Sequence, residues 1–104
     1  MIYEMKLRKE YFDKILLGEK IYEVRLNDEK RQQIDVGGII VFKQDSNLQQ
    51  TLNTIVEDLI YFDNFSDMAK TLPSKKIGFN TESIKQIIDK YHEFYNTNGN
   101  KLKL

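Results

Sequence analysis

The segment G-E-K-I-Y-E-V-R-L at positions 18–26 places a lysine, a glutamate and an arginine within six residues. They are Lys20, Glu23 and Arg25. The alternation of polar and apolar residues over 20–26 predicts a half-buried β-strand. Charged groups on such a strand cost free energy unless they are paired or bind a ligand. The segment therefore constrains the fold to one that neutralises these charges, and it is the strongest indication of a site in the chain.

The composition predicts a single domain over residues 1–104 with a packed core. Hydrophobic residues make up 40% of the 104 residues and aromatic residues 12%, which suits a small globular domain. There is no cysteine, so disulfides, thiolate metal sites and cysteine nucleophiles are excluded. The 16 basic and 16 acidic residues cancel. This argues against a strongly basic, non-specific nucleic-acid binder, although it leaves room for a local basic patch.

No sequence motif indicates a cofactor, a metal or a membrane. The chain contains no P-loop, G-x-G-x-x-G, G-x-S-x-G or H-E-x-x-H pattern, so no cofactor is expected. Its single histidine, His92, has no partner at a metal-ligand spacing, and no metal site is expected. No apolar run approaches the ~20 residues of a membrane span, and the N-terminus does not resemble a signal peptide. We expect a cytoplasmic protein.

Hydrophobic periodicity predicts mixed α and β structure with one core. Residues 27–35 are polar and predict a loop or a short helical turn. The expected strands cover residues 2–8, 20–26 and 39–43, with a further terminal strand at 101–104. Residues 48–61 are expected to contain at least one strand, with 53–61 the favoured stretch. The expected helices cover residues 9–17, 65–72 and 81–95. This order of short strands and helices favours an α+β domain with a small barrel or curled sheet.

Three motifs resemble the ASCH domain family. They are G-x-K-x-x-E-x-R at 18–25, D-E-K-R at 28–31 and V-G-x-I-x-x-F at 36–42. The resemblance implies a PUA-like small mixed β-barrel flanked by two or three helices. One position departs from the family: Gly38 stands where members usually carry an acidic residue.

The resemblance implies that the chain binds RNA or a modified nucleoside, as most members are proposed to do. The ligand cleft would include Lys20, Glu23 and Arg25, and Lys30 and Arg31 in the following loop would contact phosphates. In this interpretation Glu23 accepts a hydrogen bond from a base edge, while Arg25 holds a phosphate or carbonyl.

Two alternatives stay open. Some small bacterial members resemble amidohydrolases that deacylate acetylcytidine nucleosides, and their catalytic lysine maps onto Lys20. In that case Lys20 and Glu23 would be catalytic, although those enzymes carry a threonine at the position of Glu23. Their second glutamate lies in a later segment, where Glu57 is a candidate. The other alternative is a protein-interaction module without catalysis.

Strand geometry makes one prediction about the candidate site. Strict alternation places Glu23 and Arg25 on one face of a strand and Lys20 on the other. The three converge only if Lys20 precedes the regular strand or a bulge intervenes.

The aromatic residues near the motif and in the last predicted helix are expected to pack in the core. Tyr22 shares a strand face with apolar residues and is expected in the core. Tyr91, Phe94 and Tyr95 are expected to be core residues rather than a platform for base stacking.

Overall fold

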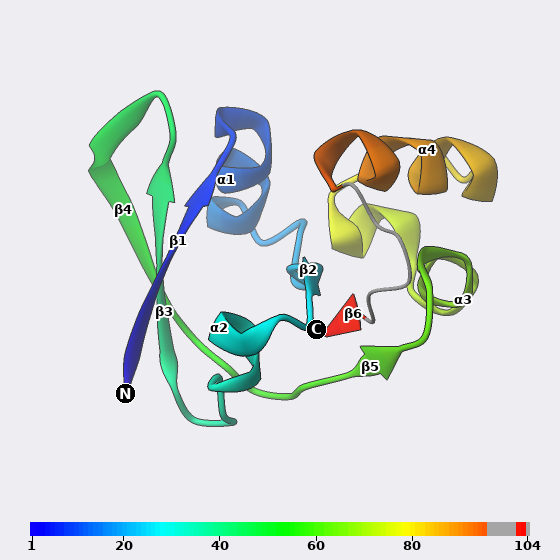
Figure 1. Ribbon diagram of the computed structural model, residues 1–104. Coiled ribbons are helices and arrows are strands. Elements are labelled where there is room, and N and C mark those ends of the chain that lie inside the picture. Colours follow the sequence, from blue (N-terminus) through cyan, green and yellow to red (C-terminus); the bar gives the residue numbers. More distant parts are fainter. Residues whose placement is uncertain (96–101, 104) are drawn as a thin grey trace.

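The computed structural model describes residues 1–95 and 102–103, and its strands form two three-stranded sheets (Figure 1). The first sheet contains β1 (Ile2–Leu7), β3 (Ile39–Gln44) and β4 (Asn47–Ile55), in the order β1-β3-β4. β1 runs parallel to β3, whereas β3 and β4 form an antiparallel hairpin. β1 and β4 are therefore the edges of this sheet.

The first strand and the first helix form as their patterns predict. Met5 and Leu7 alternate onto the buried face of β1. They pack with Phe12 of α1 (Lys9–Leu16), whose apolar stripe faces the sheet. Gly18 follows the helix with a φ of +79°, a left-handed conformation that favours glycine at the end of a helix.

The second sheet joins segments from both halves of the chain. β6 (Leu102–Lys103) lies between β2 (Arg25–Leu26) and β5 (Tyr61–Phe62), and both pairings are antiparallel. The terminal strand predicted at 101–104 is thus present at residues 102 and 103. Residues 101 and 104 lie outside the described residues.

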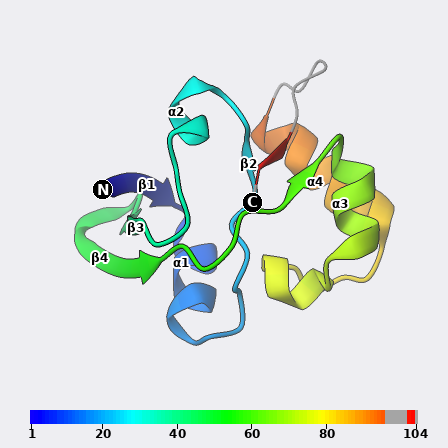
Figure 2. The ribbon, with the colours of Figure 1, turned by 90° about the horizontal axis from the view of Figure 1, so that it is seen from below.

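Two helices and a 3-10 turn lie on the side of the molecule that contains the second sheet (Figure 2). α3 (Phe65–Thr71) begins at Asn64, whose side chain accepts a hydrogen bond from Asp67 N at 2.8 Å. The 3-10 turn η1 (Ser74–Ile77) and α4 (Ile84–Phe94) follow.

The start of α4 differs from the prediction, which began the helix at residue 81. The N-cap is Ser83, whose hydroxyl accepts from Gln86 N at 3.3 Å. The hydroxyl of Thr81 accepts instead from Ser83 N at 3.1 Å. Thr81 therefore organises the turn before the helix and lies outside it.

The number of helices also differs from the two or three that were expected. The described residues contain four α-helices, because α2 (Glu29–Gln32) forms in the polar stretch after β2. Asp28 is its N-cap and accepts a hydrogen bond from Arg31 N at 2.9 Å. The capping carboxylate satisfies one of the backbone N–H groups that the first turn of a helix leaves unpaired.

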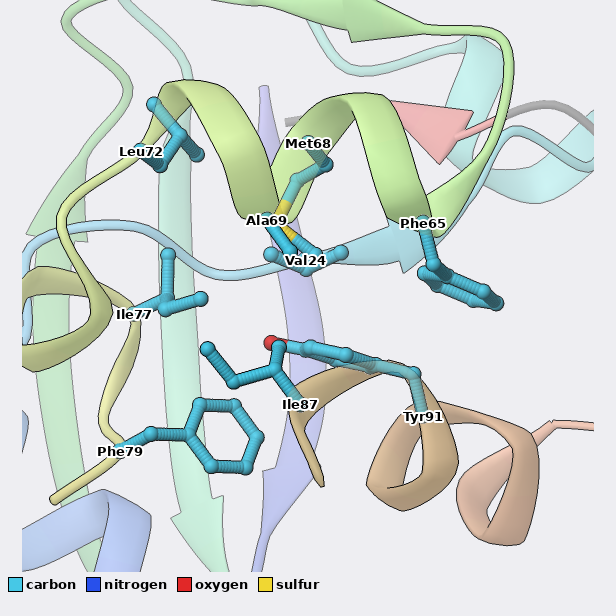
Figure 3. Close-up of a cluster of buried hydrophobic side chains, with 9 residues drawn as sticks. All are labelled: Val24, Phe65, Met68, Ala69, Leu72, Ile77, Phe79, Ile87 and Tyr91. Carbon is cyan, nitrogen blue, oxygen red and sulfur yellow. The ribbon is translucent and has the colours of Figure 1, made fainter. Parts of the chain in front are cut away.

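The core has two parts, one beside each sheet. The part under α3 and α4 is drawn in Figure 3, where apolar side chains fill the space between these helices and the segment that leads into β2. Its buried members are Val24, Phe65, Met68, Ala69, Leu72, Ile77, Phe79, Ile87 and Tyr91. Tyr22 packs against this cluster, which confirms its prediction as a core residue.

The strand predicted over residues 20–26 is wrong for most of its length, since only Arg25–Leu26 pairs as a strand. The backbone before it is bonded elsewhere. Lys20 N donates to the carbonyl oxygen of Lys14 at 3.1 Å, and the amides of Ile21 and Tyr22 donate to that of Lys76 at 2.8 and 3.0 Å. These bonds replace the ladder that an alternating pattern would otherwise make.

The structure confirms a strand within residues 48–61 but places it earlier than the favoured stretch 53–61. β4 starts at Asn47, directly after a tight turn from β3, and ends at Ile55. Because β4 is an edge strand with mostly exposed side chains, its polar residues are compatible with strand structure. The apolar residues that follow Ile55 favoured residues 53–61 in the prediction, although most of that stretch is not part of β4.

The overall class is the predicted α+β class. Among the described residues the two sheets stay separate and open, so a closed PUA-like barrel stays a prediction. Within this part of the chain, no helix combines the length and the apolar character that crossing a membrane requires.

Candidate functional site

The irregular segment between α1 and β2 turns the side chain of Lys20 into the protein. The backbone bonds of this segment to Lys14 and Lys76 dock it between α1 and η1. Lys20 is consequently only 3% exposed. Lysine is rarely buried to this extent unless its ammonium group is paired.

The ammonium group of Lys20 has three acceptors around it. Nζ donates to the backbone carbonyl oxygens of Tyr22 and of Ile77, the latter at 3.3 Å. It also forms an ion pair with Glu23 Oε1 at 3.1 Å. An ammonium group has three N–H donors, so these contacts satisfy Lys20 in its charged form.

Glu23 connects Lys20 to Arg25. Its second carboxylate oxygen, Oε2, accepts from Arg25 Nε at 2.5 Å. Arg25 Nη2 then donates to the carbonyl oxygen of Lys6 at 2.8 Å, which ties the free edge of β1 to the start of β2. All three charged heads therefore meet. Strict alternation would have separated Lys20 from its partners, and the three converge by the first of the two predicted routes, because Lys20 precedes the regular strand.

Burial and the ion pairs have opposing effects on the pKa values of Lys20 and Arg25, and the net shifts of the two residues differ in sign. Burial lowers the pKa of Lys20 and outweighs the carboxylate of Glu23, which acts to raise it. Burial is also the largest influence on Arg25 and acts to lower its pKa, but Glu23, Tyr95 and Asp28 together outweigh it and the pKa is raised. Arg25 is therefore the permanent cation of the cluster, and Lys20 is the group whose proton is more easily lost.

The cluster lies in a pocket of about 230 Å³ that opens to solvent. The end of β1 and the start of α1 contribute Lys6, Leu7, Arg8 and Tyr11. The last turn of α4 contributes a second wall, and Val24 and Ile77, which Figure 3 shows in the core, close the pocket from within.

Aromatic rings form much of the pocket wall. Tyr11, Tyr91, Phe94 and Tyr95 all line it. The ring of Phe94 meets those of Tyr11 and Tyr91 edge-on, with centroid distances of 5.9 and 5.8 Å. The hydroxyl of Tyr95 donates to the carbonyl oxygen of Val24 at 3.3 Å.

Burial keeps the tyrosine hydroxyls of this wall protonated. It raises the pKa of Tyr11 to about 12 and raises the pKa values of Tyr91 and Tyr95 as well. These three hydroxyl groups therefore stay protonated to a higher pH than those of ordinary tyrosines. The expectation of a core role is confirmed for Tyr91, which is buried in the core, and Phe94 and Tyr95 pack against it. All three also line the pocket.

The other predicted site residues lie outside the pocket. Lys30 and Arg31 are in α2, where Lys30 is exposed and Arg31 pairs with Asp28 at 3.1 Å. Glu57 is exposed in the connection after β4 and is not among the pocket residues. Neither group converges with Lys20.

Gly38, the position that departs from the family pattern, is also remote from the pocket residues. A Cβ atom there would lie 3.0 Å from the carbonyl oxygen of Asp35 and 3.3 Å from the ring of Tyr3. Gly38 thus allows close packing at the start of the first sheet.

Sequence reasoning missed Arg8, Tyr11 and Glu93, which all line the pocket. Tyr11 and Glu93 look like ordinary helix residues in the sequence, because their role depends on how α1 and α4 pack. No group of three histidine, aspartate or glutamate side chains within residues 1–95 and 102–103 is placed to hold a metal ion.

Comparison with known proteins identifies the family of this chain. The profile of the ASCH domain family matches residues 5–102, nearly the whole chain. The chain belongs to the ASCH domain family. This ASCH domain is also similar to two solved structures, whereas no curated protein matches it.

Both solved structures cover almost the entire ASCH domain. The crystal structure of hypothetical protein PH0355 is 29% identical, has a TM-score of 0.84, and the alignment covers 99% of this chain and 94% of that one. The solution NMR structure of protein PF0455 from Pyrococcus furiosus is 27% identical, with a TM-score of 0.74 and coverage of 99% and 93%.

Proposed function

We propose that this ASCH domain binds RNA or a modified nucleoside, with one base held in the aromatic pocket. The observation that carries the proposal is the convergence of Lys20, Glu23 and Arg25 inside that pocket. An isolated structural ion pair needs no adjoining cavity, whereas here the paired charges border an open space walled by aromatic rings.

The chemistry of the pocket suits an unstacked base. Proteins recognise single-stranded RNA by stacking splayed bases on aromatic side chains and by hydrogen bonds to base edges. Tyr11 and Phe94 supply ring surfaces, and Glu23 supplies an acceptor beside the donors of Arg25. A base edge that carries both donors and acceptors can therefore contact Glu23 and Arg25 together.

Contacts beyond the pocket belong to the same proposal. Lys30 and Arg31 on α2 would contact RNA phosphates along the surface, outside the pocket. The PUA-like barrel implied by the sequence motifs supports the proposal at the level of fold only, and fold does not determine function. Because the chain has no net charge, affinity has to come from these local groups.

The test is a comparison of two aromatic substitutions. Binding of short single-stranded RNAs and of nucleosides, including acetylcytidine, is measured by calorimetry for Tyr11→Leu and for Tyr61→Leu. Tyr61 is 57% exposed and is not a pocket residue. We expect Tyr11→Leu to lose about 1–3 kcal/mol of binding free energy, the usual value for a stacked base, and Tyr61→Leu to bind normally. Equal affinities for both variants, with equal thermal stability, would contradict the proposal.

A second function, amidohydrolysis of acetylcytidine-like substrates, is favoured by one observation. The lowered pKa of Lys20 makes its amine easier to deprotonate, which a catalytic lysine requires. Against this, all three N–H groups of the charged form have acceptors, and Glu57 does not reach the pocket. For these reasons we rank binding first.

The hydrolase alternative has its own assay. The protein is incubated with acetylcytidine and the formation of cytidine is followed. Release of cytidine that Lys20→Met abolishes and Tyr61→Leu leaves unchanged would establish catalysis. The absence of cytidine at high protein concentration would reject it.

A further inference from the structure

Arg8 places a cation at the mouth of the pocket. It stands between β1 and α1, lines the pocket, and is exposed to solvent. Its guanidinium carbon lies 4.8 Å from the centre of the Phe94 ring. This cation–π contact joins the start of α1 to the last turn of α4 and holds the guanidinium group at the pocket wall.

The charge of Arg8 is not balanced by the pocket itself. The carboxylate of Glu23 is shared by Lys20 and Arg25. Glu93, the remaining acid that lines the pocket, pairs with Lys90 at 3.2 Å. Within residues 1–95 and 102–103, Arg8 forms no ion pair.

The size of the pocket determines which part of a bound ligand lies at its opening. Pockets that enclose drug-sized ligands have volumes of about 300–1,000 Å³, and this one has about 230 Å³. A base fits such a space, but a complete nucleotide exceeds it. If a base occupies the pocket, its sugar and any phosphate on that sugar lie at the opening, where Arg8 is exposed.

We propose that the preferred ligand is a nucleotide with a phosphate on the ribose, and that Arg8 binds this phosphate. The inference rests on the proposed function, because it assumes that the base enters the pocket. The planar guanidinium group bonds phosphate through two N–H donors, and its contact with Phe94 reduces the entropy lost on binding. A neutral nucleoside offers this guanidinium group no anion to bind.

The same phosphate can belong to a free mononucleotide or to an RNA chain. The test therefore has two arms, one with the four common ribonucleosides and their 3′- and 5′-monophosphates, and one with a short single-stranded RNA. Both are titrated by calorimetry into the wild-type protein, Arg8→Gln, Arg8→Lys and Lys85→Gln. Lys85→Gln is the matched control, since it also removes one positive charge and its side chain is 89% exposed on α4.

In the mononucleotide arm, we expect a monophosphate to bind the wild-type protein about 10- to 100-fold more tightly than its nucleoside. Arg8→Gln is expected to remove this difference, because it weakens binding of the monophosphate far more than binding of the nucleoside. Arg8→Lys should keep part of the affinity difference between monophosphate and nucleoside, and Lys85→Gln should keep all of it. In the RNA arm, Arg8→Gln should reduce the dependence of log affinity on log salt by about one unit.

Failure of the inference and failure of the proposed function give different results. If nucleosides and monophosphates bind the wild-type protein equally, the phosphate role of Arg8 is wrong and base binding stands. If Arg8→Gln weakens both to the same extent, Arg8 supports the pocket and does not bind phosphate. If RNA alone binds and its salt dependence is the same in Arg8→Gln, the inference is also wrong. If no nucleoside, nucleotide or RNA binds, the proposed function fails and the inference fails with it.

Discussion

Glu23 holds the buried charges together, because each of its two carboxylate oxygens engages a different cation. The motif in the sequence identified Lys20, Glu23 and Arg25 as a unit, and their contacts confirm that they are paired. Their geometry could not be predicted from local periodicity. The backbone around residue 20 is bonded to Lys76, which is distant in the sequence, and this long-range docking overrides the alternating pattern.

Glu23→Gln should destabilise the protein far more than Glu4→Gln does. The substitution leaves the buried ammonium group of Lys20 without a counter-charge, and breaking a buried pair costs about 3–5 kcal/mol. Glu4 pairs with Lys43 at 3.3 Å but is 64% exposed, so the same change there should cost about 0–1 kcal/mol. Free energies of unfolding from urea titration measure both values. Equal losses would show that the Lys20 pair is not a buried one.

Tyr11 should make stability decrease at alkaline pH. Its pKa is about 12 in the folded protein against 10.0 as the ordinary value, so between these values the folded state binds more protons than the unfolded state. The stabilising contribution is therefore complete below pH 10 and is lost as the pH rises through 12. Wild type and Tyr11→Phe are compared by urea unfolding across this range. The wild-type protein should lose more stability than the variant, and parallel curves would contradict the shift.

The site depends on how α1, η1 and the irregular segment between α1 and β2 meet. The backbone of that segment is bonded to Lys14 of α1 and to Lys76 of η1. Gly78, which has a φ of +99°, is the C-cap residue of η1. Sequence patterns located β1, α1, α3 and most of α4 correctly, because these elements carry a clear apolar face. They misplaced β4, since an exposed edge strand has little apolar periodicity to detect.

Gly78→Ala should damage the site, and Gly18→Ala provides the matched control. Both glycines have positive φ, at +99° and +79°, so each alanine costs about 1–2 kcal/mol of left-handed strain. A Cβ at Gly78 would also lie 3.1 Å from side-chain atoms of both Lys20 and Tyr11, whereas a Cβ at Gly18 has nothing within 4 Å.

Thermal unfolding and ligand titration separate these two effects. Gly78→Ala should lower both the melting temperature and the affinity for RNA or nucleoside, because it displaces the side chains that form the pocket. Gly18→Ala should lower the melting temperature alone. If the two variants behave alike in both measurements, the packing of Gly78 against Lys20 does not matter for the pocket.

At the scale of the whole molecule, the pocket lies where the two halves of the fold meet. β1 and α1 supply one wall and the end of α4 supplies the other, while Arg25 joins β2 to the edge of β1. The α+β class could be predicted from the order of elements. The central position of β6 between β2 and β5 could not be predicted. The pairing of strands that are distant in the sequence leaves no local pattern. The aromatic wall was likewise hidden, since it exists only once α1 and α4 are packed.

We propose that the pocket around Lys20, Glu23 and Arg25 binds the base of an RNA or nucleoside. Backbone amide NMR spectra recorded during titration with a short single-stranded RNA would show whether the base enters this pocket. We predict that the largest shift changes fall in residues 20–25, at Ile77 and in residues 91–95. Changes confined to the exposed strand β4, or spectra that stay the same at saturating RNA concentrations, would contradict the claim.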